Sequence, residues 1–162
     1  MGQNSTASKL AGASYYAIQL ERAMKTRFMS ASSEELFNLP LYLVPAVHPS
    51  RVRDLNKEKH YFLLRKDQVE AISPEDVKLI QKEHYKDLGT REQIAQVSDE
   101  DLIYLHETQI HLLEDKRLRL LTSIKHIRAV LPEKLHHFED KQFEFLNPEQ
   151  VNLIKDSKLI LN

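Results

Sequence analysis

Apolar residues recur in an eight-residue pattern along most of the chain. Residues 32–154 divide without a gap into fifteen blocks, twelve of eight residues and three of nine. In all twelve octads the fifth and eighth residues are apolar. Self-similarity at a fixed period indicates repeated structural units. The fifth residues are Leu36, Val44, Val52, Val69, Val77, Ile94, Leu102, Ile110, Leu118, Leu135, Phe143 and Val151, and the eighth residues are Leu39, Val47, Leu55, Ile72, Ile80, Val97, Leu105, Leu113, Leu121, Phe138, Leu146 and Ile154.

The clearest blocks begin as helices begin. Ser73 is typical of an N-cap, because its hydroxyl accepts from a free backbone N–H. Pro74 fits the first helical position, where no N–H is needed. Ile72 and Val77 form the two sides of a hydrophobic staple. Residues 147–154 repeat the arrangement, so helix starts recur along the chain.

The octad spacing predicts many short helices. Apolar residues spaced alternately by three and five average 4.0 residues per turn, whereas an α-helix has about 3.6. Six prolines interrupt any continuous helix. The three glycines include no Asn-Gly or Asp-Gly pair, which disfavours hairpins. We therefore predict an all-α protein, an array of short capped helices with a solenoid-like arrangement.

Residues 98–131 predict an exception to this pattern. They contain neither Pro nor Gly, and a heptad pattern also fits them. The charged residues are acidic from Asp99 to Asp115 and basic from Lys116 to Arg128, which suits the dipole of one helix. We predict a longer helix here, with a kink near Glu114.

The length of 162 residues suits one domain. Residues 1–8 are small and polar, which predicts a flexible tail. An apolar stripe over residues 8–29 predicts a first helix. The expected organisation is a tail over 1–8 and a single helical domain over 9–162.

Composition narrows the function classes. The chain has 23 Lys and Arg residues and 24 Asp and Glu residues. The positive and negative charges nearly balance, so the charge gives no reason to expect binding to nucleic acid. There is no cysteine, which excludes thiolate chemistry and disulfides. The few glycines rule out phosphate cradles, and no nucleophile stands out from a capping context. We expect no cofactor, no enzymatic activity and no small-molecule substrate. The absence of a visible signal or membrane-spanning stretch predicts a cytoplasmic protein.

The blocks at 73–80 and 147–154 resemble the tandem L-[ST]-P-E-Q-[VI] short repeats in proteins of chlamydia-type intracellular bacteria. The resemblance covers about three quarters of the chain, although two blocks carry the best match. It implies an interaction or effector-like protein, located in the host cytoplasm if it is an effector. It transfers no functional residue.

Two histidine patterns suggest metal sites and fail on geometry. His106 and His111 flank a glutamate, but a gap of five residues turns them about 140° apart on a helix. Glu133 and His136 have the spacing of a di-iron motif, which needs a second copy that the chain lacks. We expect solvated histidines and no metal site, and keep a metal-dependent enzyme as a third class because there are eight histidines.

One basic segment is a candidate partner-binding surface. Lys116, Arg117, Arg119, Lys125 and Arg128 combine with leucines and isoleucines into a basic amphipathic helix. Such a helix suits an acidic partner or a membrane surface, and the alternative is a solvated helix face.

The N-terminal sequence suggests a lipid anchor. Gly2 lies in an M-G-x-x-x-[ST] pattern, the acceptor for N-myristoylation. A single acyl chain holds weakly and needs a second signal, which the basic segment would supply.

These observations favour a non-enzymatic protein–protein interaction module, either a bacterial effector or a structural factor. The alternative is a peripheral membrane adaptor anchored by N-myristoylation at Gly2 and the basic helix. Aromatic residues are candidate hot spots for a protein partner or, alternatively, core residues. These are Tyr42, Tyr61, Phe62, Tyr85 and Tyr104.

Overall fold

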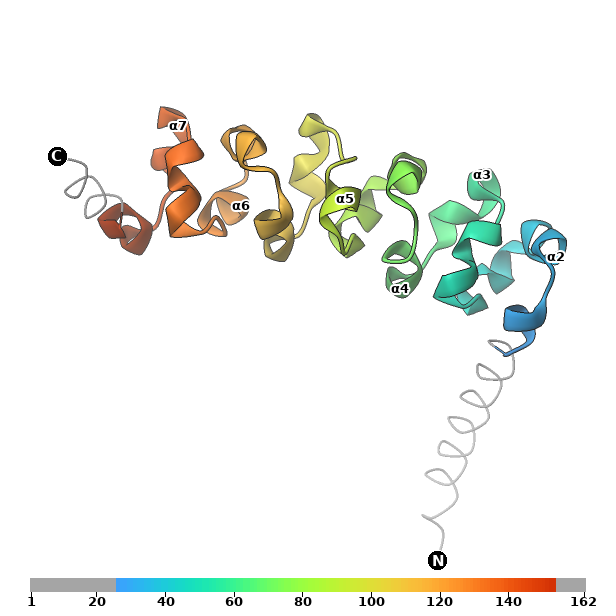
Figure 1. The fold of residues 1–162 in the computed structure, drawn as a ribbon. Helices are drawn as coiled ribbons and strands as arrows, with labels where there is room; N and C mark the ends of the chain where they lie inside the picture. The colour runs from blue at the N-terminus through green and yellow to red at the C-terminus, as the bar shows by residue number, and fades with distance from the viewer. Residues whose placement is uncertain (1–25, 154–162) are drawn as a thin grey trace, which may run out of the picture. The chain divides into compact units, whose positions relative to one another are not determined.

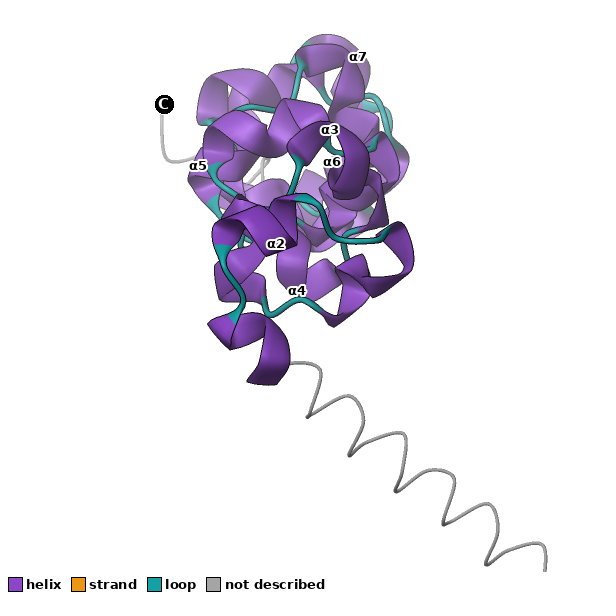
Figure 2. Ribbon diagram, turned by 90° about the vertical axis from the view of Figure 1, so that its right-hand side faces the viewer, coloured by secondary structure: helices purple, strands orange, loops and turns teal. Residues whose placement is uncertain are grey.

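The computed structural model describes residues 26–153. Within this range every regular element is a helix, and none is longer than six residues (Figures 1 and 2). The predicted all-α fold of many short helices is therefore confirmed. None of the described helices is long and apolar enough to cross a membrane.

The chain divides into two compact units, Met1–Ile72 and Ser73–Asn162, and each is described by itself. In the first unit residues 26–30 are helical and six named helices follow them. The 3₁₀-helices carry the label η. They are α2 (Ser33–Phe37), η1 (Leu41–Ala46), η2 (Pro49–Asp54), α3 (Lys57–His60), η3 (Tyr61–Leu63) and α4 (Lys66–Val69).

The second unit has the same architecture, in which six-residue 3₁₀-helices are interspersed with shorter α-helical turns. Its last described residues, 148–153, are also helical. The other elements are η4 (Pro74–Leu79), η5 (Lys82–Asp87), α5 (Arg91–Ile94), η6 (Asp99–Tyr104), η7 (Glu107–Leu112), η8 (Asp115–Leu120), α6 (Ile124–Arg128), η9 (Pro132–His137) and α7 (Asp140–Phe143).

Each octad that forms a six-residue 3₁₀-helix places that helix between two extended residues. Helix η6 starts after Ser98, whose ψ is 159°, and ends before Leu105, whose ψ is 153°. In these octads the first position is the N-cap and the apolar eighth position is the C-cap. Because both caps are extended, the chain changes direction at these blocks and cannot propagate one long helix.

The core follows the octad positions. The fifth and eighth residues of the first ten octads are buried, and they lie three residues apart on one face of each helix. The nine-residue blocks contribute equivalent pairs, such as Tyr61 with Leu64 and Ile127 with Val130. Phe143, Leu146 and Val151 near the end are half-buried. Ile154 lies outside the described residues.

The prediction of a longer helix over 98–131 is wrong. Four short helices, η6, η7, η8 and α6, occupy this segment. The heptad pattern would bury Ile103, Ile124 and Leu131, yet these side chains are 59%, 45% and 44% exposed. The octad residues of the same segment are buried instead. A straight helix would spread the octad residues around its axis, so burying them together breaks the helix at each block.

The side-chain cap predicted at Ser73 is absent from the structure. Ser73 and Ser98 occupy N-cap positions, but neither side chain makes a capping bond to the backbone. The backbone N–H of Asp76 instead donates to the Ser73 carbonyl at 3.0 Å, as a 3₁₀-helix requires. The α-helical turn α2 keeps the cap, since Ser32 accepts from Glu35.

The predicted tail over residues 1–8 and most of the predicted first helix lie outside the described residues. Phe28, the last apolar residue of the predicted stripe, is buried at 6% exposure. A single helical domain over 9–162 stays a prediction.

Candidate functional site

The predicted basic surface is divided between two short helices. Lys116 and Arg119 are exposed residues of η8, and Lys125 and Arg128 are exposed residues of α6. Arg117 differs from these four, because its exposure is 8%. The five residues therefore do not form one face of an amphipathic helix.

Arg117 is a structural residue, whereas the sequence predicted a partner-binding one. Its Nε donates to Asp99 at 2.8 Å, and its terminal nitrogens donate to the carbonyls of Ile94 and Val97 at 3.2 and 2.6 Å. The guanidinium is thus bonded within the fold through all three of its nitrogens.

The four exposed cations line separate hollows. Lys116 and Arg119 lie at a hollow of about 390 Å³ that also contains Asp99 and Glu114. The Lys116 ammonium lies 2.7 Å from Glu114, so its charge is locally compensated. This hollow is lined by both signs of charge.

Lys125 and Arg128 line a second, shallow hollow of about 470 Å³ with Glu107, Thr108 and Ala129. Helices η7 and α6, which carry these residues, contact each other. The Nε of Arg128 donates to the Phe145 carbonyl at 3.1 Å, so part of this side chain is held in place.

Sequence reasoning missed a set of buried or half-buried polar residues that join blocks distant in the chain. Each directly precedes the first apolar core position of its block, and each bonds carbonyls 20 to 24 residues earlier. We call them the cross-block residues. They are Arg51, His60, Gln68, Gln109, Arg117, His126, Gln142 and Gln150.

The glutamines show the geometry most clearly. The side-chain nitrogen of Gln109 donates to the carbonyls of Tyr85 and Leu88 at 2.9 and 2.7 Å. Its side-chain oxygen accepts from the His106 N–H, which is the N-cap of the same helix. Gln68 and Gln142 make the same three bonds in their own blocks. One side chain therefore starts its own helix and satisfies two buried carbonyls of the third block before.

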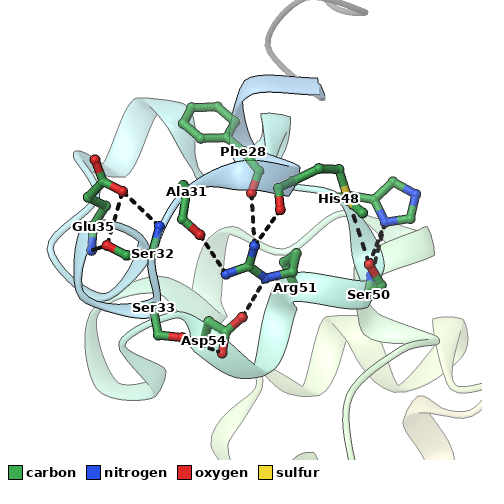
Figure 3. A network of polar contacts seen from close by, with 10 residues as sticks. Phe28, Ala31, Ser32, Ser33, Glu35, His48, Ser50, Arg51 and Asp54 are labelled. Carbon is green, nitrogen blue, oxygen red and sulfur yellow. Dashed lines mark hydrogen bonds and ion pairs between the residues drawn. The ribbon is translucent and has the colours of Figure 1, made fainter.

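Arg51 is a cross-block residue of the first unit that also bonds earlier carbonyls (Figure 3). Its terminal nitrogens donate to the carbonyls of Phe28, Met29 and Ala31, at 3.3, 2.7 and 2.9 Å. Its Nε lies 2.6 Å from Asp54 in the same helix. The hydrogen bond from Arg51 lowers the pKa of the Asp54 carboxyl, which keeps this pair charged at neutral pH.

Two histidines complete the set. The His60 side chain is buried, with an exposed fraction of 1%. Its Nε2 lies 3.0 Å from the Leu39 carbonyl oxygen, and its Nδ1 accepts a hydrogen bond from the Asn56 N–H at 3.1 Å. These contacts select the neutral ring with the proton on Nε2. The Nε2 of His126 lies 2.9 Å from the Leu105 carbonyl. Burial lowers the pKa of both rings.

The arginines and histidines of the cross-block set recur at a longer sequence spacing than the octad. Residues 51–60 and 117–126, which lie 66 positions apart, are identical at five of ten positions. Arg51 corresponds to Arg117, and His60 corresponds to His126. Both segments bond carbonyls at the same sequence separations, so the spacing was a signal that sequence analysis could have used.

The aromatic hot-spot candidates separate into two groups. Tyr61 and Tyr85 are buried and belong to the core. Tyr42, Phe62 and Tyr104 are 80%, 41% and 43% exposed. Exposed aromatic side chains are typical anchors of protein interfaces.

Histidines from both patterns that suggested metal sites make local hydrogen bonds in the structure. His106 is the N-cap of η7 and accepts from the Thr108 N–H. His136 Nδ1 lies 2.8 Å from the carbonyl of Glu133. Over residues 26–153 no three His, Asp or Glu side chains gather as metal ligands. The lipidation candidate Gly2 lies outside the described residues.

No family model matches the chain, and no curated protein or solved structure is significantly similar to it.

Proposed function

We propose that the chain is a non-enzymatic protein–protein interaction module whose octads form a solenoid-like array. The observation that carries the proposal is the contrast between buried polar and exposed apolar side chains. The cross-block residues are used to hold the backbone, whereas Phe37, Tyr42 and Ile103 are 51%, 80% and 59% exposed. Large apolar groups on a surface are typical of interaction sites.

The hydrogen bonds between blocks support the solenoid within each unit. Bonds that return to the third block before occur in the first unit at Gln68 and in the second unit at Gln109 and Gln142. Repeated contacts between near neighbours in sequence are the property that defines repeat arrays. Such arrays present outward side chains in register, which suits partner recognition.

The effector assignment and a cytoplasmic or host-cytoplasmic location rest on the resemblance to the short-repeat proteins. They remain part of the proposal. The structure gives the peripheral membrane adaptor less support than the sequence does. Arg117 is buried, so the proposed basic surface lacks one of its five charges.

Affinity capture with the full chain as bait tests the proposed function. We expect a partner protein that binds saturably, competes with free chain and is reconstituted from purified components. Flotation with vesicles containing phosphatidylserine serves as the comparison. Saturable vesicle binding without any reconstituted protein partner would favour the adaptor and contradict the interaction module.

A further inference from the structure

The two related segments, 51–60 and 117–126, differ in the surface beside them. In the second unit Glu107, Thr108, Lys125 and Arg128 line one hollow. Subtracting 66 from each number gives Leu41, Tyr42, Lys59 and Phe62 in the first unit. Helix η1 contacts α3 and η3, just as η7 contacts α6. The first unit therefore places apolar side chains where the second unit places polar ones.

The exposure of these side chains defines a surface. Leu41, Tyr42 and Phe62 are 46%, 80% and 41% exposed. Lys59 is exposed on α3, which contacts both η1 and η3. We call Leu41, Tyr42, Lys59 and Phe62 the aromatic surface. The backbone beneath it is held in place, since His60 bonds the carbonyl of Leu39, two residues before Leu41.

We propose that the aromatic surface binds an acidic amphipathic peptide segment of a protein partner. The inference rests on the proposed interaction function and specifies where the partner binds and what its chemistry is. Apolar side chains of the peptide would cover Tyr42 and Phe62, and a carboxylate would meet Lys59.

Charge complementarity selects the acidic partner. Helices η1 and η3 contain no charged residue, and α3 contributes Lys57 and Lys59 against one acid, Glu58. Within residues 26–153 the Lys59 ammonium makes no ion pair. An exposed cation at the rim of an apolar patch favours acidic partners and speeds their association.

The size of the patch selects a peptide over a folded copy of the chain. A stable interface of standard size buries about 800 Å² on each partner. Three partly exposed side chains offer only a few hundred Å² of apolar area, about the largest patch of a typical monomer. A short segment with two or three apolar anchors matches this area.

Selection from a random twelve-residue peptide library displayed on phage tests the inference with the full chain as target. We expect enriched peptides that combine Asp or Glu with Leu, Phe or Trp. Their affinity should fall at least tenfold in the double variant Tyr42→Thr with Phe62→Arg, which installs the residues of the second unit. Lys59→Glu should weaken binding and reverse its preference for acidic peptides.

Two controls separate the possible results. Ile103→Thr, a change at an exposed apolar residue of the other unit, should leave binding unchanged. The reciprocal variant Thr108→Tyr with Arg128→Phe should create a second site. Failure to enrich peptides, enrichment of basic peptides, or full retention of affinity in the double variant would each overturn the aromatic surface. Retained binding would still leave the proposed interaction function standing at another surface.

Discussion

The segments at 51–60 and 117–126 share an interior and differ in their exterior. In both, an arginine and a histidine reach carbonyls about 21 residues earlier and hold one block against an earlier one. The outward residues nearby are Leu41, Tyr42 and Phe62 in the first unit and Glu107, Thr108 and Arg128 in the second. The comparison teaches that the arginine and histidine bonds are kept in both segments while the outward residues nearby differ.

The arginines also differ in how they are anchored. Arg51 pairs with Asp54 of its own helix, and the two side chains are 18% and 19% exposed. Arg117 pairs with Asp99, which lies 18 residues earlier; the Arg117 side chain is 9% exposed and the Asp99 side chain is 58% exposed. The exposed Asp99 contributes little to stability. The loss of Arg117 should still cost more, because this arginine is the more deeply buried of the two and bonds two buried carbonyls.

The largest expected effect is that of Arg117→Met. Removal of the guanidinium leaves the buried Val97 carbonyl without its donor and takes one of two donors from the Ile94 carbonyl, which also accepts from the Val97 N–H. The loss of these two charged hydrogen bonds should lower the free energy of unfolding by about 3–5 kcal/mol. Arg51→Met should cost about 1–3 kcal/mol, because its site is more exposed. Urea denaturation measures both values. Equal losses, or a neutral Arg117→Met, would remove the distinction between the two sites.

A glutamine cross-block residue should have the next largest effect. Gln109→Leu keeps the approximate volume but leaves the Leu88 carbonyl and the His106 N–H unsatisfied and removes one of the two donors to the Tyr85 carbonyl. This change should cost about 2–3 kcal/mol. The matched control is Gln96→Leu at an exposed position, which should change stability by less than about 0.5 kcal/mol. If both variants unfold at the same urea concentration, Gln109 does not hold the blocks together.

Acid should weaken both histidine sites. Burial lowers the pKa of His60 and His126 in the folded chain, so the unfolded chain binds more protons below its own pKa of about 6.5. Their stabilisation is complete above pH 6.5 and is lost as pH falls from 6.5 towards the lowered values. The slope is at most about 1.4 kcal/mol per pH unit for each histidine.

Urea titrations from pH 7.5 to pH 5 measure this loss above the range in which the carboxylates titrate. The double variant His60→Gln with His126→Gln should have a flatter pH profile. His136→Gln, a change at an exposed histidine, should keep the profile of the original chain. A profile that is flat in the original chain would contradict the buried neutral rings.

The smallest effect belongs to the exposed ion pair between Lys82 and Asp101. The two charged groups lie 2.6 Å apart and join η5 to η6, but the Lys82 side chain is 53% exposed. Lys82→Ala should cost less than about 1 kcal/mol, with the difference shrinking in high salt. A loss as large as that of Arg117→Met would mean that exposed pairs hold the blocks as firmly as buried ones.

Much of the fold could be predicted from the octad pattern, and the reason is physical. Burial of positions five and eight follows from their apolar character, as Val52 and Leu55 show at 0% and 2% exposure. The long helix was predicted wrongly because the absence of proline between Ser98 and Leu131 was given more weight than the phase of the apolar residues. A series of short 3₁₀-helices can bury all the apolar residues of this spacing, whereas one continuous α-helix would turn some of them towards solvent.

The cross-block residues could not be recognised from their residue types. Gln68 and Arg117 are ordinarily exposed residues, and their burial depends on carbonyls more than 20 residues away. The basic segment was interpreted by charge alone, which grouped the buried Arg117 with the exposed Arg119. A comparison of residues directly before each buried position would have separated them.

Detection of the hydrogen bonds of Gln109 by NMR tests the central claim most directly. The account predicts through-bond couplings from the Gln109 side-chain amide to the carbonyl carbons of Tyr85 and Leu88, together with slow exchange of its amide protons. Gln96, which is exposed, serves as the internal reference. A Gln109 side chain that shows no such coupling and exchanges as fast as Gln96 would contradict the account.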